Sequence, residues 1–260
     1  MRWLHLILVI GIMAGLGAPA IAQDSDSAEE TASANANDEA FGGIVVSANR
    51  EGNYTVKPGD FREMIDAYYK WRSKYAPGGE LFLQLRPAKD ETVEDIGDVA
   101  AQLSRDGEII DLAFDETWLV KLPVERLGDG KWELAFNQVK GKLRVFPTIL
   151  SPGTSETLRR MGDIRLECRV FWGFYNNRVN VVLRGLFDVI GGCASKRFKP
   201  YYPLDRELVS VVIDGMESPQ PLKEPENEAY LVPISDKAVP NDALVRITFA
   251  EDPAPAETQQ

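Results

Sequence analysis

Apolar residues alternate with other residues along the middle of the chain, and this period of two is the strongest constraint on the fold. From Glu80 onward the alternation occurs in short runs, and turn-forming dipeptides such as Asp106-Gly107 and Asp129-Gly130 favour tight hairpins between them. The apolar positions are Leu81, Leu83 and Leu85; Ile110, Leu112 and Phe114; Trp118, Val120 and Leu122; and Trp132, Leu134 and Phe136. Successive side chains of a strand point to opposite faces. The pattern therefore predicts a mostly β protein with one or two antiparallel β-sandwich modules.

A further hairpin is predicted around Asn176-Asn177, a dipeptide suited to a type I′ turn. Its arms would be residues 164–175 and 178–187, and this pairing would place Cys168 opposite Gly185. Proline-rich loops divide the rest of the chain into additional short segments. We expect strands there at residues 207–213, 229–234 and 243–249.

Residues 92–104 fit two interpretations. Thr92 and Asp95 would cap a short helix, whereas residues 98–104, followed by Asp106-Gly107, would form the first arm of a hairpin. We favour the strand and keep the helix as the alternative.

The clearest helical segment begins near Asp60. This residue stands where an N-cap is expected, and Glu63 three residues later would complete a capping box. Residues 76–79, with the sequence Ala-Pro-Gly-Gly, would end the helix. The residues at helical spacing are Phe61, Met64, Ile65, Tyr68, Arg72 and Tyr75. We expect one N-terminal amphipathic helix whose aromatic face packs on a sheet.

The first 22 residues have the three parts of a secretory signal. Arg2 supplies the positive start, an apolar stretch runs through residues 6–16, and Ala20 and Ala22 are the small residues that a signal peptidase reads. We predict cleavage after Ala22 and a periplasmic or secreted product with no membrane span. An uncleaved anchor is the alternative, but Pro19 and several glycines make the segment a poor helix.

The chain divides by composition into folded parts and polar ends. Residues 23–43 and 251–260 carry many acids and few large apolar residues, which predicts disordered tails. The expected segments are the signal at 1–22, the acidic tail at 23–43, a short strand and helix at 44–79, one β module at 80–150, a second at 156–250, and the tail at 251–260.

The only two cysteines are Cys168 and Cys193. An even pair in an exported chain predicts one disulfide. A closed loop of about 25 residues would contribute about 3 to 4 kcal/mol by loop-entropy reasoning. Two separate buried thiols are the alternative.

Several chemistries are excluded because the only histidine, His5, lies within the predicted signal. Without an imidazole base, Ser-His-Asp and Cys-His catalysis cannot operate, and no zinc site or cofactor is predicted. Paired carboxylates remain available: Asp115-Glu116 between two strands, and Asp163 with Glu167. A carboxylate-based hydrolase is therefore the alternative to a protein that is not an enzyme.

Basic residues gather between Lys140 and Lys199, where twelve Lys and Arg residues stand against four acids. Aromatic residues interleave with them, most densely at residues 171–175. This surface could bind an anionic or glycan ligand, or the strands could simply present arginine on their wet face. The candidate ligand-binding residues are Arg169, Trp172, Tyr175, Arg178, Arg184, Lys196 and Arg197. We do not expect a nucleic-acid partner outside the cytoplasm.

Two stretches carry resemblances. Residues 157–170, with the sequence Thr-Leu-Arg-Arg-Met-Gly-Asp-Ile-Arg-Leu-Glu-Cys-Arg-Val, resemble a segment of exported Gram-negative bacterial proteins of uncharacterised function, with counterparts at residues 81–87 and 242–245. No activity is attached to that family. Residues 44–50 are similar to the short segment at the start of TonB-dependent outer-membrane receptors, which adds as a strand to a partner. An ordinary edge strand or linker is the alternative there.

Together these patterns predict an exported, non-enzymatic structural or interaction protein of the cell envelope. A binding module for an anionic or glycan envelope ligand is the first alternative, and the hydrolase is the second. The expected partner is an envelope protein or an anionic glycan.

Overall fold

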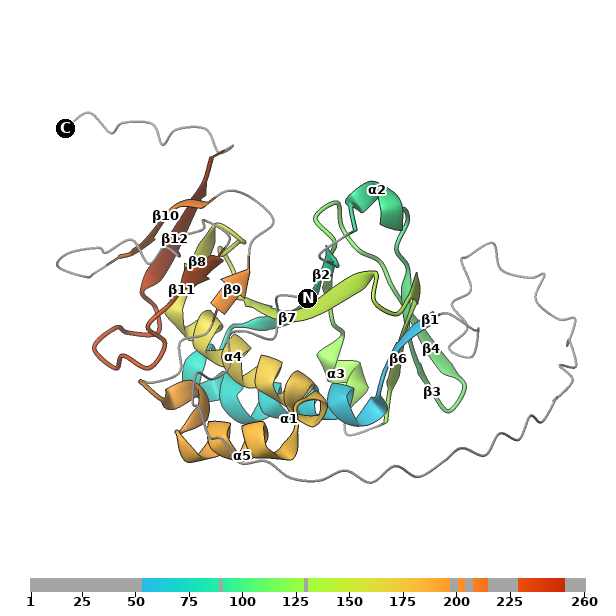
Figure 1. Cartoon of the computed structure of the whole chain (residues 1–260), viewed down its shortest axis with the longest axis horizontal. Coiled ribbons are helices and arrows are strands. Elements are labelled where there is room, and N and C mark those ends of the chain that lie inside the picture. The colour runs from blue at the N-terminus through green and yellow to red at the C-terminus, as the bar shows by residue number, and fades with distance from the viewer. Residues whose placement is uncertain are drawn as a thin grey trace, which may run out of the picture. The chain divides into compact units, whose positions relative to one another are not determined.

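The computed structural model describes residues 53–88, 91–128, 131–196, 201–203, 208–214 and 229–250. Contacts divide the chain into two units, Met1–Gly43 and Ile44–Gln260, and every described residue belongs to the second unit. The predicted signal, both predicted tails and the receptor-like segment at 44–50 lie outside the described residues. Figure 1 shows the elements of the described part in chain order.

Two long helices and several short ones accompany the strands. The helices are α1 (Pro58–Tyr75), α2 (Val93–Ile96), α3 (Val124–Leu127), α4 (Met161–Tyr175) and α5 (Val181–Val189), with 3₁₀ turns η1 (Asn176–Arg178) and η2 (Gly192–Ala194).

The strands form antiparallel sheets. One sheet has the order β1 (Asn53–Val56), β6 (Glu133–Val139), β3 (Ala101–Arg105) and β4 (Glu108–Leu112). A second has the order β5 (Leu119–Lys121), β2 (Glu80–Pro87) and β7 (Leu143–Leu150). A third has the order β10 (Leu208–Ile213), β12 (Leu244–Phe249) and β8 (Leu158–Arg160), and β11 (Ala229–Leu231) pairs with β9 (Tyr201–Pro203).

The period-two pattern of the middle of the chain is confirmed for β2 and β4, whereas three successive residues of β6, Leu134, Ala135 and Phe136, are buried. Burial alternates along β2 and β7, as half-covered strands require. Asp106 and Gly107 both have positive φ, 50° and 85°, and Arg105 lies opposite Glu108 across the two-residue loop. Both dihedrals are what a type I′ turn needs. Residues 92–104 contain both predicted elements, the single turn of α2 and then β3.

The hairpin expected at Asp129-Gly130 is wrong. The dipeptide lies outside the described residues, but its flanking strands do not pair: β5 joins β2, whereas β6 joins β1 and β3. Helix α3 lies between them and buries Val124 and Leu127. The chain therefore crosses from one sheet to the other at this point.

The capping box expected at Asp60 is also wrong. Helix α1 begins at Pro58, and Lys57 is the N-cap without a side-chain hydrogen bond. Proline suits the first helical position because a backbone N–H at that position would have no partner within the helix, so its absence costs nothing. The predicted end after Tyr75 and the burial of Phe61 are confirmed.

The hairpin expected around Asn176-Asn177 is the largest error. Residues 161–175 form α4 and residues 181–189 form α5, so Cys168 does not face Gly185 across a ladder. The description as mostly β therefore holds only in part, because helices and strands have similar shares of the described chain. The N-terminal helix and the antiparallel sheets are as expected.

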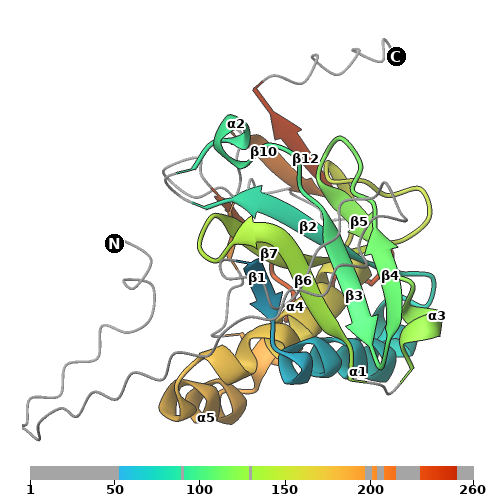
Figure 2. The ribbon, with the colours of Figure 1, turned by 90° about the vertical axis from the view of Figure 1, so that its right-hand side faces the viewer.

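Helix α4 contributes to both hydrophobic cores of the described chain. Leu166, Val170 and Phe174 pack into the larger core, which includes α1 and the first two sheets, whereas Ile164 and Cys168 pack into the smaller core around β10 and β12. Figures 1 and 2 both show α4 beside α1. The two cores are thus joined through α4.

Two glycines let α1 and α4 approach closely. A Cβ at Gly162 would lie 2.1 Å from the carbonyl oxygen of Tyr75, and one at Gly173 would lie 2.5 Å from that of Glu63. The order of these contacts makes the two helices antiparallel. Only glycine fits at both positions without moving the backbone.

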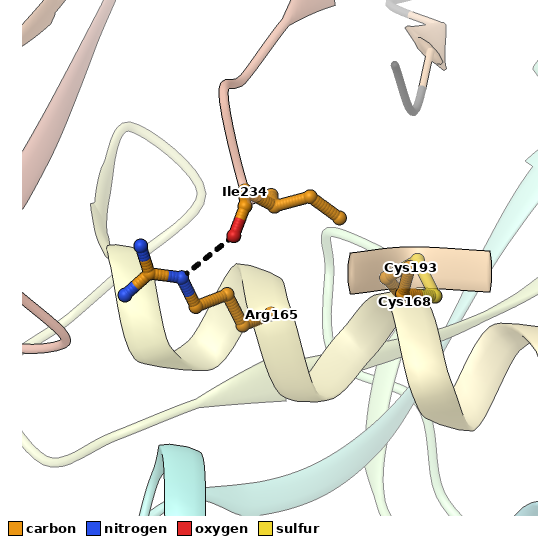
Figure 3. The surroundings of a disulfide bond; sticks show 4 residues. All are labelled: Arg165, Cys168, Cys193 and Ile234. Carbon is orange, nitrogen blue, oxygen red and sulfur yellow. Dashed lines mark hydrogen bonds between the residues drawn. A yellow bond between two sulfur atoms is a disulfide. The ribbon is translucent and has the colours of Figure 1, made fainter. Parts of the chain in front are cut away.

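The predicted disulfide is confirmed. Cys168 of α4 and Cys193 of η2 are bonded, with Cα atoms 6.1 Å apart, as Figure 3 shows. The bond closes a loop that contains η1 and α5. In the part of the chain that the structure describes, no helix is both long and apolar enough to cross a membrane.

Candidate functional site

Side chains of α4 cover one edge of β7. Strand β2 pairs with the other edge, and among the described residues no strand pairs with this one. The Asp163 carboxylate accepts hydrogen bonds from the Ser151 backbone N–H at 3.0 Å and its hydroxyl at 2.6 Å. Tyr175 lies twelve residues after Asp163 in α4, and its hydroxyl donates to the Val145 carbonyl at 2.6 Å. An uncovered edge would expose unpaired backbone groups, so α4 replaces a strand.

A buried ion pair lies between these two contacts. The Glu167 carboxylate accepts from the Ile149 N–H at 2.9 Å and from the Arg159 guanidinium at 2.6 Å. Arg159 also donates to the Ile149 carbonyl at 3.0 Å. Pro147, which has no N–H to satisfy, is the residue at the centre of this edge.

Three of the four carboxylates that the sequence offered for catalysis, Asp115, Asp163 and Glu167, are engaged in structural contacts. Asp163 and Glu167 are both buried against β7. Asp115 accepts from the backbone of Thr117 and Leu119, each at 2.9 Å. Burial alone would raise the pKa of Asp115, but these hydrogen bonds and that of the Thr117 hydroxyl outweigh it and lower the pKa.

The aromatic residues predicted to bind a ligand contact other side chains of the protein. Trp172 stacks on Phe187 of α5 with ring centroids 3.8 Å apart. The Arg169 guanidinium lies over the Trp71 ring at 4.7 Å. Burial raises the pKa of Tyr175 to about 12. These contacts join α4 to α5, to α1 and to β7.

Two of the basic residues predicted to bind a ligand, Arg178 and Arg184, also contact other side chains of the protein. Arg178 donates to the Asp60 carboxylate at 2.9 Å, and Arg184 donates to the Asn177 side chain at 3.2 Å. Burial alone would lower the pKa of Arg178, but its hydrogen bonds with Asp60 and Tyr54 raise it. Lys196 is exposed, and Arg197 lies outside the described residues.

Asp60 and Glu63 hold η1 instead of capping α1. The Glu63 carboxylate accepts from the side-chain amides of Asn176 at 2.6 Å and Asn177 at 3.0 Å. With the Asp60–Arg178 pair, these bonds fix the turn that leads from α4 into α5. The supposed hairpin turn is therefore a 3₁₀ turn anchored to α1.

Arg165 is a structural residue that the sequence did not single out. Its guanidinium donates to the carbonyls of Ile234 at 2.9 Å and Val239 at 2.8 Å, and to the Asn241 side chain at 2.6 Å. Figure 3 shows the bond to Ile234. Burial lowers the pKa of Arg165. The loop before β12 is thereby attached to α4.

Helix α5 differs from α1 and α4 because none of its residues is buried. The Asn180 side chain caps it by accepting from the Leu183 N–H at 2.9 Å. After the helix, Gly191 has a φ of 94°, which is typical of a residue that ends a helix. Phe187, stacked on Trp172, holds one side against α4.

The other side of α5 carries an exposed apolar face, which consists of Val181, Val182, Gly185, Leu186 and Val189. The exposed fractions are 70% for Val181, 74% for Val182, 37% for Leu186 and 85% for Val189. At 3.6 residues per turn these five positions fall within an arc of about 140°. We call this arc the α5 face and consider it the candidate functional site.

Sequence reasoning missed the α5 face because residues 178–187 were interpreted as a strand. The signals for a helix were nonetheless present. Asn180 is a favoured N-cap residue, and Val182, Leu186 and Val189 have the spacing i, i+4, i+7 of one helical face. Gly191-Gly192 supplies the stop.

Among the described residues, no group of three or more His, Cys, Asp or Glu side chains is placed to hold a metal ion. No protein-family model matches the chain, and neither a curated protein nor a solved structure is detectably similar to it.

Proposed function

We propose that this chain is an exported, non-enzymatic interaction protein of the cell envelope that docks through the α5 face. The observation that carries the proposal is the exposure of Val181, Val182 and Val189 on a helix that is otherwise fixed to the protein. Contiguous exposed apolar surface marks interaction sites. The helix needs no ordering on binding, and this saves entropy.

The disulfide supports the location. The bond between Cys168 and Cys193 suggests a compartment outside the cytoplasm, because such bonds persist where thiols are not kept reduced. The signal predicted at residues 1–22 fits that inference, and the periplasm is the location we propose.

The size of the α5 face suits reversible docking. Full burial of a valine or leucine side chain contributes about 1.5 to 3 kcal/mol. Burial of Val181, Val182, Leu186 and Val189 together would therefore supply several kcal/mol, before the cost of association is subtracted. This is enough for a specific but dissociable contact.

Affinity capture tests the proposal. The chain would be expressed with its own leader, purified from the periplasmic fraction of a Gram-negative host and incubated with envelope extract. We expect the variant Val182→Asn/Val189→Asn to lose the components that wild type retains. Valine and asparagine have similar helix propensities, so the change removes apolar surface and not the helix.

A matched control uses two exposed valines elsewhere, Val139 of β6 and Val209 of β10. The variant Val139→Asn/Val209→Asn should retain everything that wild type retains. If the α5 variant and wild type capture the same components, docking through this face is wrong.

A further inference from the structure

We propose that the surface to which α5 docks is an anionic phospholipid bilayer, with the helix lying parallel to the membrane plane. This inference rests on the proposed function and names its partner. An interfacial helix needs an apolar face, a polar opposite side and basic residues close by.

The geometry of α5 fits a shallow interfacial position. The α5 face occupies one arc, the residues that contact the protein body occupy another, and Arg184 and Asp188 lie between the two arcs by helical spacing. Nine residues extend about 14 Å, far too little to span a bilayer. Because Asn180 caps the helix and Phe187 anchors it, the apolar side chains are presented together without folding on contact.

The charge around α5 favours an anionic surface. The whole chain has a formal charge of −11, yet residues 140–199 hold twelve bases against four acids. Arg178 is already paired with Asp60 at 2.9 Å, so the basic residues next to α5 in sequence that can meet headgroups are Arg184 and Lys196, against one acid, Asp188. Basic residues beside an apolar face are attracted to anionic headgroups, and salt weakens that attraction.

A second copy of the chain is a poorer occupant. A symmetric contact places the same patch of both copies together, and would therefore bring the two copies of Arg184, which flanks the α5 face, close to each other. Like charges at such a contact oppose association, whereas phosphate headgroups complement them.

Vesicle flotation tests the inference on the protein purified as above. Wild type should float with vesicles of phosphatidylglycerol mixed with phosphatidylcholine, and far less with phosphatidylcholine alone. The variant Val182→Asn/Val189→Asn should bind the anionic vesicles about tenfold or more weakly, in line with the loss of two buried apolar groups. Val139→Asn/Val209→Asn should bind like wild type.

Charge is tested separately with Arg184→Gln/Lys196→Gln. This variant keeps the α5 face, and its binding to anionic vesicles should fall severalfold and lose most of its dependence on salt. Circular dichroism and urea unfolding identical to wild type would show that each variant is folded. Equal binding to neutral and anionic vesicles, or binding unchanged in the α5 variant, would overturn the inference.

The two proposals fail in different ways. If wild type does not float with either vesicle, but capture of an envelope protein still depends on Val182 and Val189, the lipid partner is wrong and docking through α5 stands. If neither flotation nor capture depends on these residues, both proposals are wrong.

Discussion

Helices α4 and α5 follow one another in the chain, and both are rich in apolar residues, but the protein uses them in opposite ways. Eleven residues of α4 are buried, including the polar side chains of Asp163, Arg165 and Glu167. No residue of α5 is buried, and its valines face outward. The two helices are joined by η1 and linked again by the disulfide to η2.

The difference shows which apolar residues the fold requires. On α4 each side has its own partner: α1, β7, the smaller core and the loop before β12. On α5, Phe187 stacks on Trp172 and Arg184 donates to Asn177, whereas the α5 face is exposed. Exposed valines that do not stabilise the fold are best explained by a contact outside the chain.

The largest effect is expected from the buried ion pair on α4. Arg159→Met removes the cation beside Glu167 and leaves a buried carboxylate without its charge partner. The free energy of unfolding should fall by about 3 to 5 kcal/mol, measured by urea denaturation. The neighbouring Arg160→Met is the control, because that side chain is exposed and its change should cost little.

A second variant shows whether charge is the cause. In Arg159→Met/Glu167→Gln the buried carboxylate is neutral, and the glutamine oxygen can still accept from the Ile149 N–H. The double variant should therefore be more stable than Arg159→Met alone. If it is less stable, lost packing and not an uncompensated charge explains the first result.

The next effect is expected from the link between the two helices. Cys168→Ala/Cys193→Ala opens the loop that contains α5, and the sequence separation of 25 predicts a loss of about 3 to 4 kcal/mol in unfolding free energy. A reducing agent should lower the stability of wild type to a similar extent and leave the variant unchanged. A wild type insensitive to reductant would contradict this account.

Glycine substitutions compare the two helices directly. Gly162→Ala in α4 would place a methyl group 2.1 Å from the Tyr75 carbonyl oxygen and should cost about 2 to 3 kcal/mol. Gly185→Ala in α5 meets nothing within 4 Å and should stabilise the protein by about 0.5 to 1 kcal/mol through helix propensity. The two changes have opposite signs only if α4 is enclosed and α5 is not.

The end of α4 should respond to alkaline pH. Burial raises the pKa of Tyr175 from 10.0 to about 12, so the folded state favours the neutral phenol. This stabilisation is present below pH 10 and is lost as the pH rises to 12, a change of about 2 kcal/mol. In Tyr175→Phe, unfolding free energy should fall less steeply over this interval. Equal slopes in both proteins would contradict it.

The sequence predicted the sheets better than the helices, and the reason is physical. Strands such as β2 and β7 have one covered and one less covered face, so their burial alternates and leaves a period of two. The turn at Asp106-Gly107 was predictable because type I′ dihedrals favour those residues. The disulfide was predictable because an even count of cysteines coincides with a predicted export signal.

Helix α4 could not be recognised from a single apolar face at helical spacing, because the helix is buried on several sides. Ile164 and Cys168 belong to one core, and Leu166, Val170 and Phe174 belong to the other. When both sets are read along the sequence, residues 164, 166, 168 and 170 fall at every second position and imitate a strand. Local reasoning likewise assigned Asp60 to a cap, whereas its partner Arg178 is 118 residues away in the chain.

The smallest effect on stability, and the sharpest test of the contrast, is expected on the α5 face. Val182→Asn/Val189→Asn should change the free energy of unfolding by no more than about 0.5 kcal/mol per site, since both side chains are already in water. Val170→Asn in α4, a position with no exposed surface, should cost more than about 3 kcal/mol because it buries an amide among apolar groups. Urea denaturation of the three proteins measures the difference. If the α5 variant lost as much stability as Val170→Asn, its valines would support the fold, and their exposure would give no reason to expect a membrane or any other partner.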